Sequence, residues 1–443
     1  MTTMPPTSNT VHAYRGRVLH FLHDPQYRER DAYEYWEDGL LVVSAGKVLQ
    51  AGDYATLRET LPADAQVHDY SGKLIVPGFI DTHIHFPQTD MIASPSPGLL
   101  HWLETYTFPE ERRFESPQYA AGVASFFLDE LLRNGTTSAL VFATVHAASV
   151  DALFDAALAR DMRIVSGKVL MDRGPATLRD TVSSGRADSE VLIARWRGRG
   201  RLGYAITPRF ALTSSDAQLA DAGTLLAAHP DALLHTHLAE NLGECAAVAA
   251  RFPDAADYLD VYDRFGLVGA RSVFAHCIHM SDRALGRMGA AGSAIAFCPT
   301  SNLFLGSGLF DLAAADRHGV QTGLGSDVGA GTSFSLLATM AEAYKVCQLR
   351  GASLDPFRAL HLATAGGARA LGLADSIGAL QPGQEADFIL LDDRATPLLA
   401  RRTAGASLFD RLFALQILGD DRAIAGTWLA GKRVYARHEG TPC

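Results

Sequence analysis

The stretch PGFIDTHIHF, residues 77–86, decides how this chain is interpreted. Residues 79–82 form a β-like run that ends in His83-Ile84-His85. Side chains two residues apart on a strand point to the same face, so the two imidazoles are expected to converge. A first-row metal ion binds such a pair at a rigid strand end. A bare H-x-H pair also occurs by coincidence, so the rest of the chain must decide between a metal site and two unrelated histidines.

Length and composition exclude several classes of protein. The chain has 443 residues, of which 48% are hydrophobic and 20% charged, which suits a soluble globular protein with one large domain and a smaller one. The formal net charge of −10 argues against a nucleic acid as partner, because binding a polyanion requires clustered Lys and Arg. A small-molecule substrate is therefore expected.

The cysteine pattern and the lack of a targeting signal point to the cytoplasm. The five cysteines are odd in number and show no C-x-x-C spacing, which predicts neither a disulfide framework nor a zinc ribbon and favours a reducing compartment. The first ten residues, MTTMPPTSNT, have no basic or apolar region typical of a signal peptide, and no long apolar run predicts a membrane span. We expect a cytoplasmic protein with no membrane partner.

Both ends of the chain have the character of short strands. Residues 14–19, 39–43 and 47–52 near the start, and 386–391 and 426–435 near the end, are apolar β-type runs separated by turn residues. This pattern predicts a small composite β domain, a β-sandwich built from residues 1–76 and 378–443. Residues 77–377 would then form an inserted catalytic domain.

The middle of the chain alternates apolar β-rich runs with amphipathic segments, as parallel strands covered by helices do. Eight strands are predicted, at residues 79–83, 137–142, 163–169, 203–207, 232–237, 272–276, 293–297 and 320–325. In the first intervening segment, Ser116-Pro117 predicts a helix start and Gly135 its end. Eight βα units favour an α/β fold with a closed (β/α)8 TIM-like barrel. The alternative is an open doubly wound sheet, but no glycine-rich phosphate loop follows the first strand.

Residues that bind metals or transfer protons follow several of these strands, where a barrel places its active groups. His83 and His85 end the first strand, His237 the fifth, and Asp327 follows the eighth. Three imidazoles and a carboxylate suit Zn²⁺, and iron or cobalt could use the same ligands. His235 competes with His237, which is preferred because it lies nearer the strand end; His235 is expected to be a buried histidine behind the site.

Proton transfer needs further groups beside the metal. Glu240 follows His237 by three residues and is predicted to act as general acid and base. His276, at the end of the sixth strand, would orient the attacking hydroxide, and Asp327 can accept a proton from water. His279 is assigned to the loop after His276.

With these residues in place, the chain resembles the amidohydrolase superfamily, and within it the guanine deaminase family. The superfamily resemblance covers nearly the whole chain through the split β domain, PGFIDTHIH, HLAE, AHC and GLGSDVGAG. The narrower resemblance rests on HFPQTD at residues 85–90, WLETYTFPE at 102–110, TPRF at 207–210 and CPTSN at 298–302. WLETYTFP is the most specific of these motifs.

The resemblance implies one zinc ion per chain and the conversion of guanine to xanthine and ammonia, a step of purine catabolism. A metal-activated hydroxide would attack C2 while Glu240 protonates N3 and then the departing amine. Gln88 and Arg209 would bind the purine, since an arginine fork can meet the adjacent O6 and N7 acceptors. Phe210 and Trp102 would stack on the base or simply pack beside it.

Two departures from related enzymes narrow the interpretation. The fourth strand, GYAIT, lacks the bridging lysine of two-metal members, which favours one metal. The H-x-E and P-C-x-x-C signature of the other zinc deaminases is also missing. A related amidohydrolase acting on 8-oxoguanine, cytosine or a triazine remains the alternative, followed by a non-catalytic scaffold. A homodimer is expected, with the apolar segment 335–340 as a possible contact.

Overall fold

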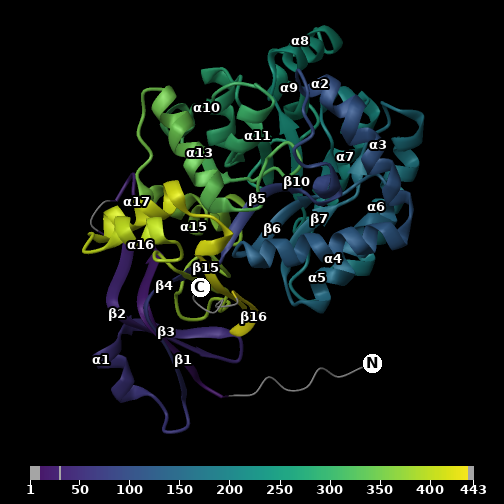
Figure 1. Cartoon of the computed structure of the whole chain (residues 1–443). Helices are drawn as coiled ribbons and strands as arrows, with labels where there is room; N and C mark the ends of the chain where they lie inside the picture. Colours follow the sequence, from purple (N-terminus) through teal and green to yellow (C-terminus); the bar gives the residue numbers. More distant parts are fainter. Residues whose placement is uncertain (1–9, 29–30, 438–443) are drawn as a thin grey trace.

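The computed structural model describes residues 10–28 and 31–437 and consists of a helix-covered barrel beside a separate sheet (Figure 1). Residues 1–9, in which no signal peptide was expected, and Cys443 lie outside the described residues. Among the described helices, none has the length and apolar character needed to cross a membrane.

The predicted barrel is confirmed. Eight parallel strands neighbour one another in the order β13-β12-β11-β10-β9-β7-β6-β5, and short β8 also pairs with β9. Their bounds are β5 Phe79–His85, β6 Thr136–Phe142, β7 Arg163–Gly167, β8 Val169–Leu170, β9 Gly203–Pro208, β10 Leu233–Leu238, β11 Ser272–His276, β12 Ala294–Phe297 and β13 Gln321–Leu324. The ring nearly closes, because Thr82 Oγ1 donates to the Leu324 carbonyl (2.9 Å) and the Asp327 amide to the His83 carbonyl (2.9 Å).

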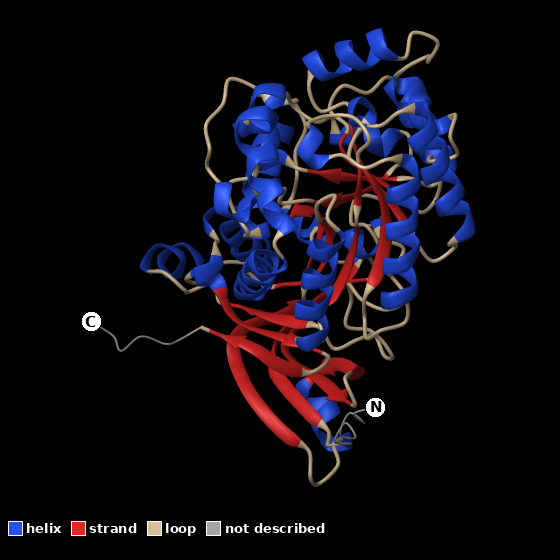
Figure 2. Ribbon diagram, turned by 90° about the vertical axis from the view of Figure 1, so that its right-hand side faces the viewer, coloured by secondary structure: helices blue, strands red, loops and turns tan. Residues whose placement is uncertain are grey.

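Helices surround these strands (Figure 2). They include α4 Pro117–Arg133, α5 Ala147–Ala159, α6 Val182–Trp196, α7 Asp216–Ala228, α8 Leu242–Arg251, α9 Tyr258–Asp263, α10 Asp282–Ala291, α11 Pro299–Phe304, α12 Leu312–Arg317, α13 Leu336–Leu349, α14 Pro356–Leu362 and α15 Ala365–Ala370. Helix α4 begins as predicted, since Ser116 caps the Tyr119 amide and Pro117 needs no helical donor. Gly135 follows its end with φ of 81°, a conformation that favours glycine.

The second sheet joins both ends of the chain, as predicted. It contains seven strands in the order β16-β15-β14-β4-β1-β2-β3, connected in one hydrogen-bonded path. Their bounds are β1 His12–Phe21, β2 Tyr33–Ser44, β3 Lys47–Asp53, β4 Gln66–Pro77, β14 Phe388–Leu391, β15 Ile424–Leu429 and β16 Lys432–Ala436. Tyr14, Phe388 and Trp428 are among its buried core side chains. The domain boundaries at residues 76 and 378 stay a prediction.

One feature was not predicted, and one expectation was wrong. Helices α16 (Pro397–Thr403) and α17 (Leu408–Leu418) lie between β14 and β15, and α17 packs on α13 and α14. The apolar segment 335–340 offers no dimer contact, because Leu336, Leu337 and Met340 are buried in α13. That expectation was wrong, since an apolar helix stripe in a barrel protein packs inward.

The segment that contains WLETYTFPE forms a nearly continuous helix over the barrel. Helix α2 (Leu99–Trp102) passes through a π-helical turn at Leu103–Thr107 into α3 (Phe108–Arg112). Pro109 has no amide hydrogen and would collide with the carbonyl four residues earlier in a regular helix, so a widened turn suits this position. Residues 94–98 before it form a loop.

Candidate active site

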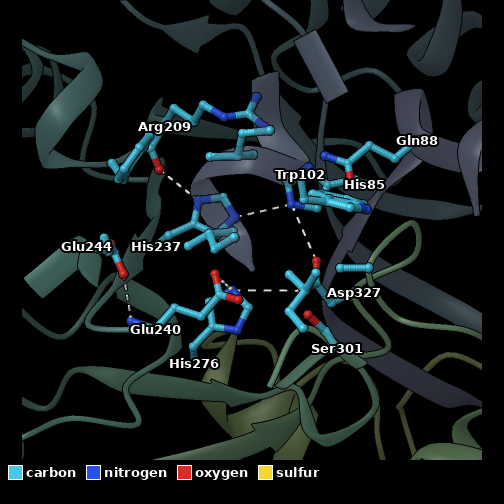
Figure 3. Close-up of a pocket in the computed structure, with 15 residues that line it drawn as sticks. His85, Gln88, Trp102, Arg209, His237, Glu240, Glu244, His276, Ser301 and Asp327 are labelled. Carbon is cyan, nitrogen blue, oxygen red and sulfur yellow. Dashed lines mark hydrogen bonds and ion pairs between the residues drawn. The ribbon is translucent and has the colours of Figure 1, made fainter. Parts of the chain in front are cut away.

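The predicted metal and proton-transfer residues come together at the carboxyl ends of the barrel strands. Figure 3 shows five of them, namely His85, His237, Glu240, His276 and Asp327. His83 and His85 come from β5, His237 from β10 and His276 from β11. Asp327 lies three residues beyond β13. His276 and Asp327 have backbone φ angles of 70° and 51°, values that residues other than glycine rarely adopt. Such strained backbone clusters at functional sites.

The nitrogen and oxygen atoms of the four predicted ligands converge on one point. Asp327 Oδ1 lies 3.2 Å from His83 Nε2 and 3.5 Å from His85 Nε2. His85 Nε2 lies 3.1 Å from His237 Nε2. Ligands about 2.0–2.2 Å from a tetrahedral zinc ion stand apart by about this much.

The protonation of the imidazoles also suits a metal. Burial lowers the pKa of His83, His85 and His237 well below the usual range, so these rings are neutral. His237 Nδ1 donates to the Arg209 carbonyl (2.7 Å), which leaves the Nε2 lone pair free. His83 Nε2 is buried and, among the described residues, has no hydrogen-bond partner. These free nitrogens fit a bound cation.

His235 lies behind this cluster, as predicted. It is fully buried, and its Nε2 lies 2.7 Å from His83 Nδ1, so it can fix the orientation of the His83 ring. Two further residues approach the site closely enough to ligate. The ligand atoms of His276 lie within 4.8 Å of those of His83 and His237, and Cys298 Sγ is equally close to His83 and Asp327. No spacing pattern in the sequence pointed to Cys298.

Glu240 lies beside the ligand cluster and is suited to exchange protons near neutrality. Burial raises the pKa of Glu240 to about 7. Its Oε2 lies 3.4 Å from His276 Nε2, and Ser307 Oγ donates to Oε1 (3.0 Å). Burial opposes the charged form of His276, but the Glu240 and Asp327 carboxylates outweigh it and raise the His276 pKa. Burial likewise raises the pKa of Asp327.

Three supporting residues were not predicted. Glu244 accepts hydrogen bonds from the amides of Glu240 (2.9 Å) and Asn241 (3.1 Å) and from Tyr258 Oη (2.7 Å). The N-x-x-E spacing of Asn241 and Glu244 is a capping-box pattern that could have revealed this role.

Asp81 and Ser307 are the other two. Asp81 Oδ1 accepts from the amides of His83 and Ser326 (both 3.1 Å), and so connects the first and last barrel strands. Burial raises the pKa of Asp81 to about 7. The Ser307 carbonyl also lies 2.8 Å from Nε2 of His279, which is in the predicted loop. Asp81 and Ser326, like Ser307 and Glu240, are far apart in the chain, and such pairs leave no local pattern.

A cavity opens next to this cluster, with about 410 Å³ of empty space that is partly open to solvent. All four residues predicted to contact a purine line it, namely Gln88, Trp102, Arg209 and Phe210. Trp102 Nε1 donates to the Ser94 carbonyl (3.0 Å), which fixes the indole against Leu99, Leu103 and Leu305. In Figure 3, Arg209 and Gln88 lie on one side of His237 and His85, and Glu240 and His276 lie on the other. The cavity therefore combines an apolar wall with polar groups at two ends.

Known proteins resemble this chain along almost its full length. The model of the amidohydrolase family matches residues 74–434. The guanine deaminase of Escherichia coli (strain K12) is 49% identical over 434 residues, which cover 97% of this chain and 99% of that protein. Its solved structure has a TM-score of 0.94 and covers 96% of this chain and 100% of that one. A crystal structure of guanine deaminase from C. acetobutylicum with bound guanine has a TM-score of 0.87 at 28% identity and covers 96% of this chain and 100% of that one.

Proposed function

This chain belongs to the amidohydrolase family, and on that premise we propose that it hydrolyses guanine to xanthine and ammonia. The observation that carries this function is the similarity of this chain to guanine deaminases over nearly its full length. Its ligand cluster also lies directly beside the cavity. The reaction adds water across the C2–N3 bond of the purine and then expels the 2-amino group from C2. The residues around the cavity can each be given a part in it.

We infer that His83, His85, His237 and Asp327 hold one divalent metal ion. Their neutral nitrogens and single carboxylate favour Zn²⁺, with Fe²⁺ as the alternative. Strand β9 carries no lysine that could bridge a second ion. A bound divalent ion lowers the pKa of water towards neutrality and stabilises negative charge on the attacking oxygen.

Glu240 is the residue that moves protons between water and substrate. With a pKa raised to about 7, its carboxyl group can both accept and donate a proton at neutral pH. It takes a proton from the attacking water and delivers it to N3 of the purine. The second proton of the former water passes by way of Asp327 to Glu240, which delivers it to the amine that leaves C2 as ammonia.

His276 and the purine-binding residues orient the reactants. His276 Nε2 lies 3.4 Å from Glu240 and 3.8 Å from Asp327, so it can hold the attacking oxygen between them. Arg209 and Gln88 bind the polar edge of the purine. Phe210 and Trp102 contact its ring faces or edges within the apolar wall.

Ammonia release from the purified protein tests this function. Guanine, 8-oxoguanine, adenine and cytosine are supplied in parallel, and metal content is measured on the same sample. We expect rapid release from guanine and about one equivalent of zinc or iron per chain. Release from another heterocycle but not from guanine would replace the proposed substrate. Absence of both metal and turnover would indicate a non-catalytic scaffold.

We also propose that the protein is a cytoplasmic homodimer. Leu398 and Phe409 expose 60% and 49% of their surface on α16 and α17, and such apolar side chains suit contact with a second copy. Light scattering coupled to size-exclusion chromatography measures the mass directly. A monomeric mass at micromolar concentration would refute the dimer.

A further inference from the structure

Glu111 is a buried carboxylate on α3 that lies behind two residues of the cavity wall. Only 1% of its surface is exposed, and it does not line the cavity itself. We propose that Glu111 is a positioning residue that fixes the hydrogen-bonding groups of Gln88 and Arg209, and so makes the site select a purine with a C6 carbonyl and an N1–H. This inference rests on the proposed function.

The contacts of Glu111 join both residues to one carboxylate. Its Oε1 accepts from Gln88 Nε2 (3.2 Å) and from Arg209 Nη1 (2.9 Å), and its Oε2 accepts from Arg209 Nη1 (2.7 Å). An ionised carboxylate can only accept hydrogen bonds. The side-chain amide of Gln88 must therefore turn its nitrogen towards Glu111.

This orientation determines what the cavity presents to a ligand. Gln88 Oε1, an acceptor, is left for the cavity, because the amide nitrogen is turned towards Glu111. Among the described residues, the side chain of Arg209 bonds only through Nη1, so its Nε and Nη2 donors remain free. One acceptor beside a set of donors complements a lactam edge, in which a carbonyl oxygen adjoins an N–H. Adenine presents the reverse pattern, with a donor at C6 and an acceptor at N1.

The position of Glu111 follows from the helix that carries it. Phe108, also on α3, places its ring centroid 5.4 Å from Arg209 Cζ, so the same helix contacts the guanidinium with both a carboxylate and an aromatic ring. The neighbouring Glu110 instead pairs with Arg113 (2.8 Å) away from the cavity. Arg209 is only 2% exposed, and a buried guanidinium needs such a charged partner.

Competitive inhibition of guanine deamination by hypoxanthine and adenine tests the proposal. Both lack the 2-amino group and differ in the C6 and N1 pattern. We expect the wild-type protein to bind hypoxanthine at least tenfold more tightly than adenine. Glu111→Gln, which frees the Gln88 amide to turn over, should reduce that ratio about tenfold. Glu110→Gln, which removes a carboxylate from the same helix, should leave the ratio unchanged.

The ratio of two inhibition constants does not depend on how much of a variant is folded. An unchanged ratio in Glu111→Gln, in a wild-type protein that deaminates guanine, would overturn the inference alone. A wild-type protein that releases no ammonia from guanine would instead overturn the proposed function. If Glu111→Gln has too little activity to assay, Glu111→Asp keeps the charge but withdraws it by one methylene, and the ratio should again fall.

A double-mutant cycle separates positioning from general support of the fold. Gln88→Ala removes the amide through which Glu111 acts, so adding Glu111→Gln to it should change the ratio much less than it does in the presence of Gln88. Equal changes in the two backgrounds would show that Glu111 does not act through Gln88.

Discussion

Glu240 is the side chain on which the proposed chemistry depends most directly. Glu240→Gln keeps the size of the side chain and its bond from Ser307 but cannot carry a proton between water and purine. We expect kcat to fall by about 10²–10⁴-fold, the usual contribution of a general acid–base group. Metal content should stay at the wild-type level, because Glu240 lies outside the predicted ligand set.

Steady-state ammonia release and metal analysis measure the two effects. Glu59→Gln, an exposed carboxylate in the small β domain, serves as the matched control and should behave like the wild type. Turnover retained in Glu240→Gln would remove Glu240 from the mechanism.

Sequence reasoning worked at the residue scale where a strand end carries its own signal. His83, His85, His237 and Asp327 each lie near the end of a strand or just beyond it, and the structure brings all four together. Glu111 and Ser307 could not be found this way. Their importance lies in contacts with Gln88, Arg209 and Glu240 that are distant in the chain, and a single buried carboxylate or hydroxyl gives no periodic pattern.

At the scale of elements, the glycines of GLGSDVGAG explain how β13 and its following turn fit against the first strand. Each lies where an added Cβ would collide with a neighbour: Gly323 with Thr82, Gly325 with Cys298 and His83, Gly329 with Gln88, and Gly331 with the Ser326 carbonyl. The motif therefore secures close approach of the backbone to the site. Its sequence pattern predicted the ligand Asp327, but not these contacts.

Gly331→Ala should disturb the site through the backbone. Its Cβ would lie 1.8 Å from the Ser326 carbonyl and 2.7 Å from that of Asp327, so the turn that carries Asp327 must shift. We expect kcat/KM to fall at least tenfold and the free energy of unfolding to drop by about 1–3 kcal/mol, the usual cost of overpacking.

Gly122→Ala is the matched control for this substitution. Gly122 lies within α4, and nothing would meet its Cβ within 4 Å. Alanine should stabilise that helix by about 0.5–1 kcal/mol without changing activity. Denaturant unfolding and guanine turnover compare the two variants, and a Gly331→Ala protein as active as Gly122→Ala would contradict the packing argument.

At the scale of the whole molecule, His361 links the barrel to the small β domain and predicts acid sensitivity. It lies on α14, is 2% exposed, and its ring meets Phe21 of β1 edge-on at 5.7 Å. Burial lowers its pKa to about 4; the Asp24 carboxylate opposes this shift, and Arg369 and Arg358 add to it.

The folded-state pKa of His361 thus lies below the value near 6.5 expected for the unfolded chain. The unfolded chain binds the proton more tightly, so the stability from this histidine is fully present above pH 6.5 and is lost as pH falls towards 4. We expect the melting temperature to fall over this range and to fall less in His361→Gln. Differential scanning fluorimetry across pH measures both proteins, and parallel curves would exclude His361 as a source.

The architecture could be predicted because the eight apolar strand segments of the barrel and the β-rich ends of the chain are local sequence patterns. All eight barrel strands occur where they were expected, with ends displaced by a few residues at most. Helices α16 and α17 were missed because the small β domain was inferred from its strands alone. The buried face of α13 was misjudged because a helix stripe does not reveal which surface covers it.

The pairing of β4 with β14 constrains the order in which the parts of this protein fold. The two strands lie side by side, with Ile389 opposite Val76, although the whole barrel separates them in the chain. During synthesis the edge of β4 has no partner until β14 leaves the ribosome, and closing so long a loop is slow. The barrel can therefore fold first, and the sheet is completed last. Until then, an open strand edge is exposed to neighbouring chains, which makes the interval before release the period of greatest risk of aggregation.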